Sequence, residues 1–98
     1  MTSKAKGDVD GVREASDVAW VYLLRCADDS LYCGWTTDLE KRVEAHRTGV
    51  ASKYTRTRLP VEVAASWSFE DASAARREEW RIKQLTREQK LALVAATR

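Results

Sequence analysis

The sequence predicts a small α+β domain, in which a three-stranded antiparallel sheet is flanked by three helices in the order β-β-α-β-α-α. Apolar and aromatic residues gather in three short runs bounded by turn residues, and residues typical of helix starts precede three longer segments. The chain has 98 residues, of which 44% are hydrophobic and 33% are charged. This composition is typical of a globular domain with one core.

The boundaries of these elements come from local patterns. Turn residues at positions 27–30 separate the first two strands, which therefore form a hairpin. Thr37 and Thr86 each begin a capping box, and Asp71 is a further helix N-cap. Gly49 predicts the end of the first helix. We expect strands over 18–26, 31–36 and 61–69, helices over 38–48, over 72–85 and from 87 onward, and a basic loop over 50–59.

The register of the strands follows from turn chemistry and alternation. Asp-Asp-Ser favours an odd-numbered loop centred on Asp29, because tight two-residue turns strongly favour glycine. Paired residue numbers then have an even sum, so we expect Tyr22 and Tyr32 on the same face of the sheet. The third strand alternates over residues 61–65, which predicts that its odd-numbered side chains share one face.

The N-terminal residues and the two cysteines bear on the cellular compartment. Residues 1–17 are polar and without periodicity, so we interpret them as a flexible tail before a domain over 18–98. The sequence contains neither an apolar run of membrane-spanning length nor a secretory signal, which favours the cytoplasm. Cys26 and Cys33 are too far apart for a Cys-x-x-Cys motif, and we interpret them as small core residues. No feature requires an oligomer, so we expect a monomer.

Positive charge is concentrated in one part of the chain. The net charge of the whole chain is only +2, but one stretch has six basic residues against a single acid, Glu44. Such a local excess, with Tyr54 inside it, suits a phosphate backbone, although an ordinary solvated surface is the alternative. The basic residues are Lys41, Arg42, Arg47, Lys53, Arg56 and Arg58.

The first predicted helix has one inward stripe. Leu39, Val43 and His46 follow helical spacing, so they share a face. Arg42 flanks that stripe, and we expect it to face the sheet rather than bulk water. An arginine in this position could bind an anion or pair with a buried carboxylate.

The second predicted helix carries an unexpected carboxylate. Glu79 lies on a stripe with Ala75 and Ile82, where an apolar residue is expected. A carboxylate directed toward a core is costly unless it is paired or bound to a metal. The alternatives are an ion pair with Arg42 and a side chain that reaches out to solvent. We expect Trp80 to pack or to lie at the rim rather than to stack on a base.

Five motifs in a fixed order complete the pattern: Trp20-Val21-Tyr22, Tyr32-Cys33-Gly34, Asp38-Leu39-Glu40-Lys41-Arg42 with His46, Lys53-Tyr54-Thr55-Arg56, and Ala75-Arg76-Arg77-Glu78-Glu79-Trp80. In this order and spacing they resemble the GIY-YIG nuclease superfamily, specifically its small stand-alone bacterial members. The first triplet stands for Gly-Ile-Tyr and the second for Tyr-Ile-Gly. The first keeps only its tyrosine, and Trp35 stands where some excision-repair members carry a lysine. The resemblance covers residues 18–93.

The resemblance implies a metal-dependent endonuclease that hydrolyses phosphodiester bonds in DNA, including structured or branched DNA and a role in DNA repair. Glu79 would bind Mg²⁺ or Mn²⁺ through an oxygen ligand. Arg42 would clamp the non-bridging phosphate oxygens. Either Tyr22 or Tyr32 would take the proton from the attacking water. His46 either passes that proton onward or only packs against the sheet.

Two other classes of function compete with a nuclease. One is a nucleic-acid-binding module of the same fold with little turnover, and the other is a protein-interaction domain. Binding alone does not require an inward carboxylate, which weighs against the interaction domain. We expect Gly34 to allow a phosphate to approach the backbone closely. The other residues predicted to bind nucleic acid are Lys41, Arg47, Lys53, Tyr54, Arg56 and Arg58.

Overall fold

A computed structural model describes residues 18–97, so the predicted tail lies outside the described residues. Strands β1 (Ala19–Arg25), β2 (Leu31–Thr36) and β3 (Glu62–Phe69) form one antiparallel sheet in the order β2-β1-β3. The predicted class and element order are confirmed, with one addition: a single helical turn inside the predicted basic loop. The helices are α2 (Leu39–Arg47), α3 (Lys53–Arg56), α4 (Ala72–Lys83) and α5 (Arg87–Ala96).

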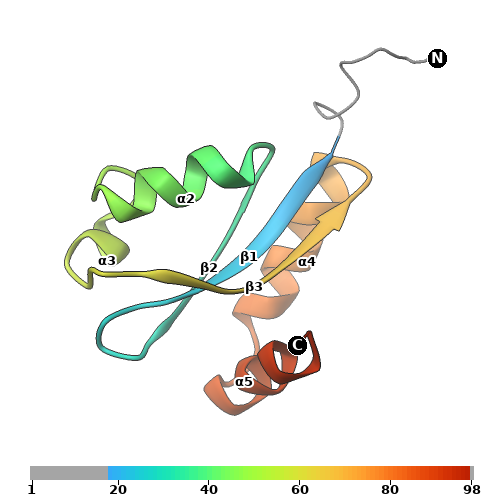
Figure 1. Cartoon of the computed structure of the whole chain (residues 1–98). Coiled ribbons are helices and arrows are strands. Elements are labelled where there is room, and N and C mark those ends of the chain that lie inside the picture. Colours follow the sequence, from blue (N-terminus) through green and yellow to red (C-terminus); the bar gives the residue numbers. More distant parts are fainter. Residues whose placement is uncertain (1–17, 98) are drawn as a thin grey trace.

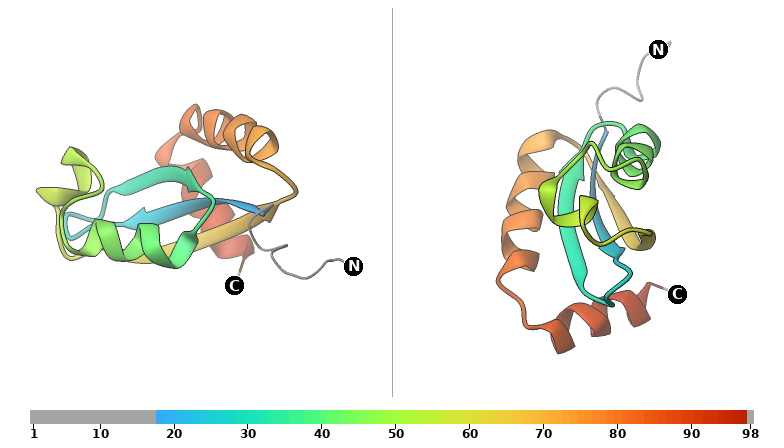
Figure 2. Two further views of the ribbon diagram at one scale, coloured as in Figure 1. Left: turned by 90° about the horizontal axis from the view of Figure 1, so that it is seen from above. Right: turned by 90° about the vertical axis from the view of Figure 1, so that its left-hand side faces the viewer.

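The helices cover opposite faces of the sheet. Helices α2 and α3 lie on one face, and α4 and α5 lie on the other, with the edge strand β2 between them (Figures 1 and 2). Each face has its own core, because successive strand residues point to opposite sides. The α2 face buries Tyr22, Leu24, Cys26, Val43 and Val61. The α4 face buries Ala19, Val21, Leu23, Cys33, Ala65, Ala75, Ile82 and Val94.

This division explains the two cysteines. Cys26 and Cys33 are both buried, and both carry free thiols. They belong to the cores on opposite faces, so the sheet separates them. Their interpretation as small core residues is confirmed.

The hairpin has the even register that the sequence predicts. Tyr22 pairs with Gly34 and Leu24 with Tyr32, which places both tyrosines on the α2 face. The loop lies one residue earlier than expected. The backbone N–H of Cys26 donates to the Ser30 carbonyl at 2.9 Å, which leaves residues 27–29 as the loop. Its last residue, an aspartate, has φ of 71°, the left-handed position of a three-residue hairpin loop.

The predicted alternation of the third strand is wrong beyond its first residues. Leu23 pairs with Ala65 and Leu24 with Val63, so Ala64 is an extra residue in β3. A β-bulge of this kind reverses the faces of the residues that follow it. Ala65 therefore packs into the α4 core, whereas Val61 packs into the α2 core.

The helix caps agree with the sequence at three of four points. Asp71 caps α4, and Thr86 forms a capping box with Gln89 at the start of α5. Gly49, with φ of 84°, follows the end of α2. The N-cap of α2 is Asp38 rather than Thr37, because the Asp38 carboxylate accepts the backbone N–H of Lys41 at 3.1 Å. None of the helices formed by residues 18–97 has the length and apolar character that a membrane crossing requires.

Candidate active site

A buried chain of hydrogen bonds links the sheet to α2 and α3. The Tyr22 hydroxyl lies 2.8 Å from Nε2 of His46, and Nδ1 of the same ring lies 2.8 Å from the Thr55 hydroxyl. Tyr22 is 2% exposed, and the other two residues are fully buried. His46 therefore occupies the inward position that its helical spacing predicts, and it makes specific polar contacts there.

A second contact of Thr55 points to one direction for these bonds. The Thr55 hydroxyl donates to the backbone carbonyl of Ser52 at 3.4 Å, so its lone pairs can accept from His46. We infer that Nδ1 of His46 carries the proton and that Nε2 accepts the Tyr22 hydroxyl. Each buried ring nitrogen is then satisfied, as buried polar atoms require.

The surroundings keep both Tyr22 and His46 uncharged. Burial, and next the charge of Arg42, lower the pKa of His46 below its ordinary value. Burial also raises the pKa of Tyr22 well above that of a free phenol, with a further contribution from nearby Tyr32. At neutral pH the ring is therefore a hydrogen-bond acceptor for a protonated phenol.

The lowered pKa of His46 predicts a loss of stability in mild acid. The unfolded chain binds a proton near pH 6.5 that the folded chain does not, so this stability is present above about pH 6.5 and is lost as pH falls toward the lowered pKa. The slope can reach about 1.4 kcal/mol per pH unit. His46 is the single histidine of the chain, and the lowered carboxyl pKa values of Asp28 and Glu78 act at lower pH.

Urea denaturation between pH 5 and 8 measures this effect. The wild-type unfolding free energy is expected to decline below pH 6.5, and that of His46→Gln is expected to change less across the same range. Equal slopes in the two proteins would contradict the assignment of a buried, neutral His46.

Gly34 makes room for the Tyr22 phenol. A Cβ atom at position 34 would lie 2.5 Å from the Tyr22 hydroxyl oxygen and 2.6 Å from its ring carbon Cζ. The missing side chain thus lets the phenol extend across β2. We predicted a close approach at Gly34, but the group that approaches is a tyrosine of the same chain rather than a phosphate.

Tyr32 lies between the buried His46 ring and the exposed Tyr54 ring. Its ring centroid lies 5.1 Å from His46 and 5.8 Å from Tyr54, with the two tyrosine planes inclined by 30°. The guanidinium carbon of Arg58 lies 3.7 Å from the centroid of Tyr54. Arg58 also pairs with Asp28 at 3.0 Å, which ties the α3 segment to the hairpin loop. Tyr32 is half-buried, so it is more accessible than Tyr22.

Arg42 is exposed, which corrects the prediction that it faces the sheet. Val43 and His46 take the inward positions of α2, so the long side chain of Arg42 extends from the flank into solvent. The charge of Arg42 still acts on the buried hydrogen bonds. Together with burial it lowers the pKa of His46, and it opposes the increase in the pKa of Tyr22.

Glu79 lies at the rim of a cavity rather than inside the core. The side chain is 20% exposed, and its carboxylate pairs with Lys83 one turn later at 3.2 Å. Within residues 18–97 no ion pair joins it to Arg42, so the alternative of a buried pair between them is wrong. The cavity has a volume of about 440 Å³ and is lined by Ser73, Arg76, Arg77, Glu79 and Trp80.

The Glu79 segment of α4 packs against β2. The Cys33 sulfur lies 4.0 Å from the backbone carbonyl of Glu79, which places this part of α4 directly against β2. Burial, and next the charge of Glu79, raise the pKa of Cys33 to about 11. The Glu79 charge also contributes to the raised pKa of Tyr22. Helix α4, which carries Glu79, and helix α2, which covers the tyrosines, lie on opposite faces of the sheet with β2 between them (Figure 2).

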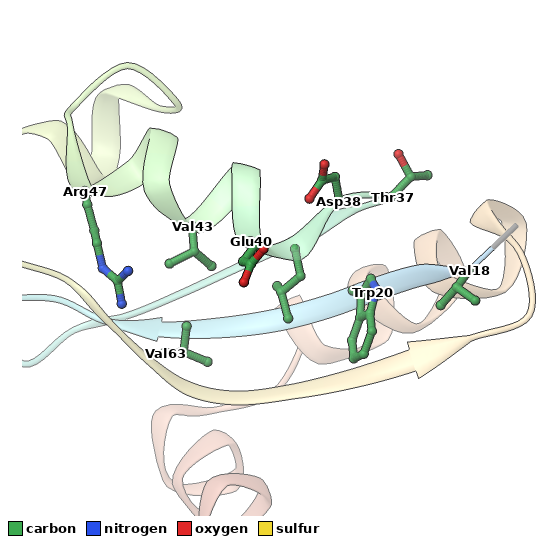
Figure 3. Close-up of a pocket in the computed structure, with 9 residues that line it drawn as sticks. Val18, Trp20, Thr37, Asp38, Glu40, Val43, Arg47 and Val63 are labelled. Atoms are coloured by element: carbon green, nitrogen blue, oxygen red, sulfur yellow. The ribbon is translucent and has the colours of Figure 1, made fainter. Parts of the chain in front are cut away.

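The predicted basic stretch divides into paired and unpaired cations. Arg58 is held by Asp28, and Arg47 lies 4.0 Å from Glu44. Arg47 also lines a separate cavity of about 900 Å³ between α2 and the strands β1 and β3 (Figure 3), and none of the three tyrosines lines it. Within this basic stretch, the cations with no acidic partner among residues 18–97 are Lys41, Arg42, Lys53 and Arg56, all of them exposed.

The donor set fits an open metal site with few protein ligands. In the described part of the chain, no group of three or more His, Cys, Asp or Glu side chains gathers as a closed site would need. Mg²⁺ is usually held by one or two carboxylates, with water and substrate phosphate as the other ligands. Glu79, half-buried at the rim of its cavity, offers such a carboxylate.

Sequence reasoning missed Thr55, Ser52 and Lys83. Ser52 caps the single turn of α3, and its Ser-x-x-Thr spacing is a signal that could have placed Thr55 on the inner side of that turn. The pair of Glu79 with Lys83 has i, i+4 spacing, which is also readable from the sequence. The contact of Thr55 with His46 is tertiary and has no local signal.

Comparisons with known proteins show the family of this chain. The GIY-YIG catalytic domain matches residues 18–92. A UPF0213 protein of Lactococcus lactis subsp. cremoris is 51% identical over 76 residues, which cover 76% of this chain and 78% of the relative. One of Halobacterium salinarum is 49% identical over 73 residues, 74% of this chain and 95% of the relative. The solution NMR structure of a UPF0213 protein from Bacillus halodurans is 40% identical, with a TM-score of 0.54 over 81% of this chain and 84% of that one.

Proposed function

Because the chain belongs to the GIY-YIG nuclease family, we propose that it is a metal-dependent endonuclease that hydrolyses phosphodiester bonds in DNA. The proposal is carried by one observation: Tyr22 packs over Gly34 and shares a face of the sheet with Tyr32, while the backbone of Glu79 lies against the neighbouring Cys33. The charges of Arg42 and Glu79 both act on the Tyr22 phenol. The two free, buried cysteines suit the reducing cytoplasm, where we place the protein.

Each side chain has a role in this proposal. Glu79 would hold Mg²⁺ or Mn²⁺, which supplies positive charge to the phosphate and the leaving oxygen. Arg42 is exposed and its charge acts on the Tyr22 phenol, so its planar guanidinium could bind two oxygens of a phosphate at this site. Lys41, Lys53 and Arg56 would neutralise the flanking phosphates. Release of Glu79 from Lys83 would free the carboxylate for the cation.

The two tyrosines differ in what they can reach. Tyr22 is buried, and its proton is donated to His46, so we assign it the role of positioning. Tyr32 is half-buried on the same face, and it is the phenol that an attacking water can meet. We therefore assign Tyr32 the role of orienting that water. Tyr32 would accept the proton of the water only as a phenolate, after its own proton has passed to solvent.

Phenylalanine substitutions separate these roles. Tyr32→Phe is expected to reduce the cleavage rate by about 10²- to 10⁴-fold, the usual contribution of general-base catalysis, with little change in stability. Tyr22→Phe is expected to lower the unfolding free energy by about 1–3 kcal/mol, because Nε2 of His46 loses its buried partner. Single-turnover cleavage and urea denaturation measure the two effects. The reverse pattern would exchange the two assignments.

A binding module with little turnover is the alternative. Incubation of the purified protein with supercoiled plasmid separates the two functions, with Mg²⁺ or with EDTA. We expect nicked circles that form with Mg²⁺, stop with EDTA and resume when Mg²⁺ is added back. A mobility shift without nicked product, at every divalent cation concentration, would favour the binding module. Parallel reactions with branched DNA and with RNA would define the substrate and test a role in DNA repair.

A further inference from the structure

Trp80 is an exposed aromatic residue beside the proposed metal ligand. Its side chain projects from α4 with 66% of its surface exposed, although tryptophan is usually mostly buried. It lines the same cavity of about 440 Å³ as Glu79. The sequence predicts that Trp80 packs or lies at the rim rather than stacks on a base. The structure places it at the rim, and its exposure reopens the question of stacking. Large exposed apolar side chains next to polar groups commonly mark binding surfaces.

Two cations accompany this indole. Arg76 and Arg77 line the cavity and are exposed, and Arg77 donates to the Ser73 hydroxyl at 3.1 Å. Neither guanidinium has an acidic partner within the described segment. The other acid of this helix, Glu78, forms a bidentate pair with Arg81. The cavity thus combines one exposed ring with positive charge that no neighbouring side chain neutralises.

We propose that Trp80, Arg76 and Arg77 form a subsite for an unpaired nucleotide of a DNA or RNA strand. The base stacks on the indole of Trp80, and the two guanidinium groups contact the adjoining phosphates. The subsite rests on the proposed function in one respect: it adjoins the phosphate that is cleaved at Glu79. The helix that carries the subsite, α4, lies across β2 from α2 and α3, which carry the other unpaired cations (Figure 2).

The chemistry of the surface favours this occupant over others. In a duplex both faces of every base are already stacked, so an exposed indole gains contact area only from an unpaired base. A second copy of the chain would bring further arginines to the same place, which like charges disfavour. An acidic protein would satisfy the two guanidinium groups, and the experiment below tests that possibility.

Binding measured without cleavage tests the subsite. The Glu79→Gln protein in EDTA is titrated into a fluorescent oligothymidine strand and, separately, into a duplex of equal length. In this Glu79→Gln background, the further substitution Trp80→Ala is expected to weaken single-strand binding about 5- to 150-fold. It should change duplex binding much less. Trp80→Phe should restore most of the affinity, because the ring is kept. Replacing Arg76 and Arg77 with alanine should reduce the salt slope by about 1.4, at roughly 0.7 per phosphate contact.

Arg81→Ala is the matched control, because Arg81 pairs with Glu78 and does not line the cavity. It should leave single-strand affinity unchanged. Single-strand affinity that is unaffected by Trp80→Ala, or an equal loss for single strand and duplex, would overturn the subsite. The subsite would also be overturned if Trp80 were needed for dimer formation, or for binding an acidic protein, but not for binding a single strand. Binding that depends on Trp80 in a protein that never cleaves would support the subsite and reject the nuclease.

Discussion

Replacing Glu79 with glutamine is expected to reduce the cleavage rate by about 10³-fold or more. A bound divalent cation supplies several kcal/mol to the transition state, and each 1.36 kcal/mol corresponds to a factor of ten. The fold should survive, because the substitution removes only the rim pair with Lys83. Such i, i+4 pairs stabilise a helix by about 0.2–0.5 kcal/mol. Single-turnover cleavage and urea denaturation measure the two quantities in the same preparation.

Glu78→Gln is the control for this substitution. Glu78 is the adjacent carboxylate, it is also half-buried, and it also pairs with an arginine or lysine of α4. Its replacement should change stability by a similar small amount and leave cleavage unchanged. If Glu78→Gln abolished cleavage and Glu79→Gln did not, the metal ligand would be assigned to the wrong position. A large loss of stability in Glu79→Gln would indicate a structural carboxylate.

Adding one methyl group at Gly34 is expected to damage both the fold and the site. The new Cβ would lie 2.5 Å from the Tyr22 hydroxyl, so the phenol must move away and lose its bond to His46. Overpacking of this kind usually lowers the unfolding free energy by about 1–3 kcal/mol. A displacement of about 1 Å near reacting groups can reduce a rate about 10²-fold. We therefore expect Gly34→Ala to unfold at lower urea and to cleave at least 10²-fold more slowly.

A double-mutant cycle identifies the cause. In a Tyr22→Leu background the space over position 34 is open, so Gly34→Ala should cost little there. The coupling between the two substitutions should then be about 1–3 kcal/mol, the usual upper range for residues in direct contact. Additive effects would mean that Gly34 matters for a reason other than the Tyr22 phenol.

Local patterns predicted most of the fold because its elements have clear local signals. Residues 31–36 form a strand between turn residues, and Asp71 and Thr86 each have the side-chain oxygen that a helix start requires. The cap of α2 was assigned one residue too early, since Thr37 and Asp38 are both good N-caps. The sequence does not predict the bulge at Ala64, because the apolar and polar residues of this strand alternate in the same way whether or not one residue is left unpaired.

The candidate site was predictable in composition but only partly in geometry. Helical spacing placed His46 on the inner face of α2, and the hairpin loop predicted that Tyr22 and Tyr32 share a face. The exposure of Arg42 was not predictable, because a residue that flanks a stripe can turn either way. The bond from His46 to Thr55 joins α2 to a turn inside a loop, and only the tertiary structure brings them together.

We place catalysis at the edge of β2, between Glu79 on one face and Tyr32 and Arg42 on the other. Titration of Mn²⁺ into ¹⁵N-labelled protein tests this location directly, since the paramagnetic ion broadens the amide signals of nearby residues. We predict that broadening is strongest at Gly34 and Glu79 and is lost in Glu79→Gln. Broadening centred on the aspartates of the hairpin loop, or unchanged in Glu79→Gln, would contradict the claim.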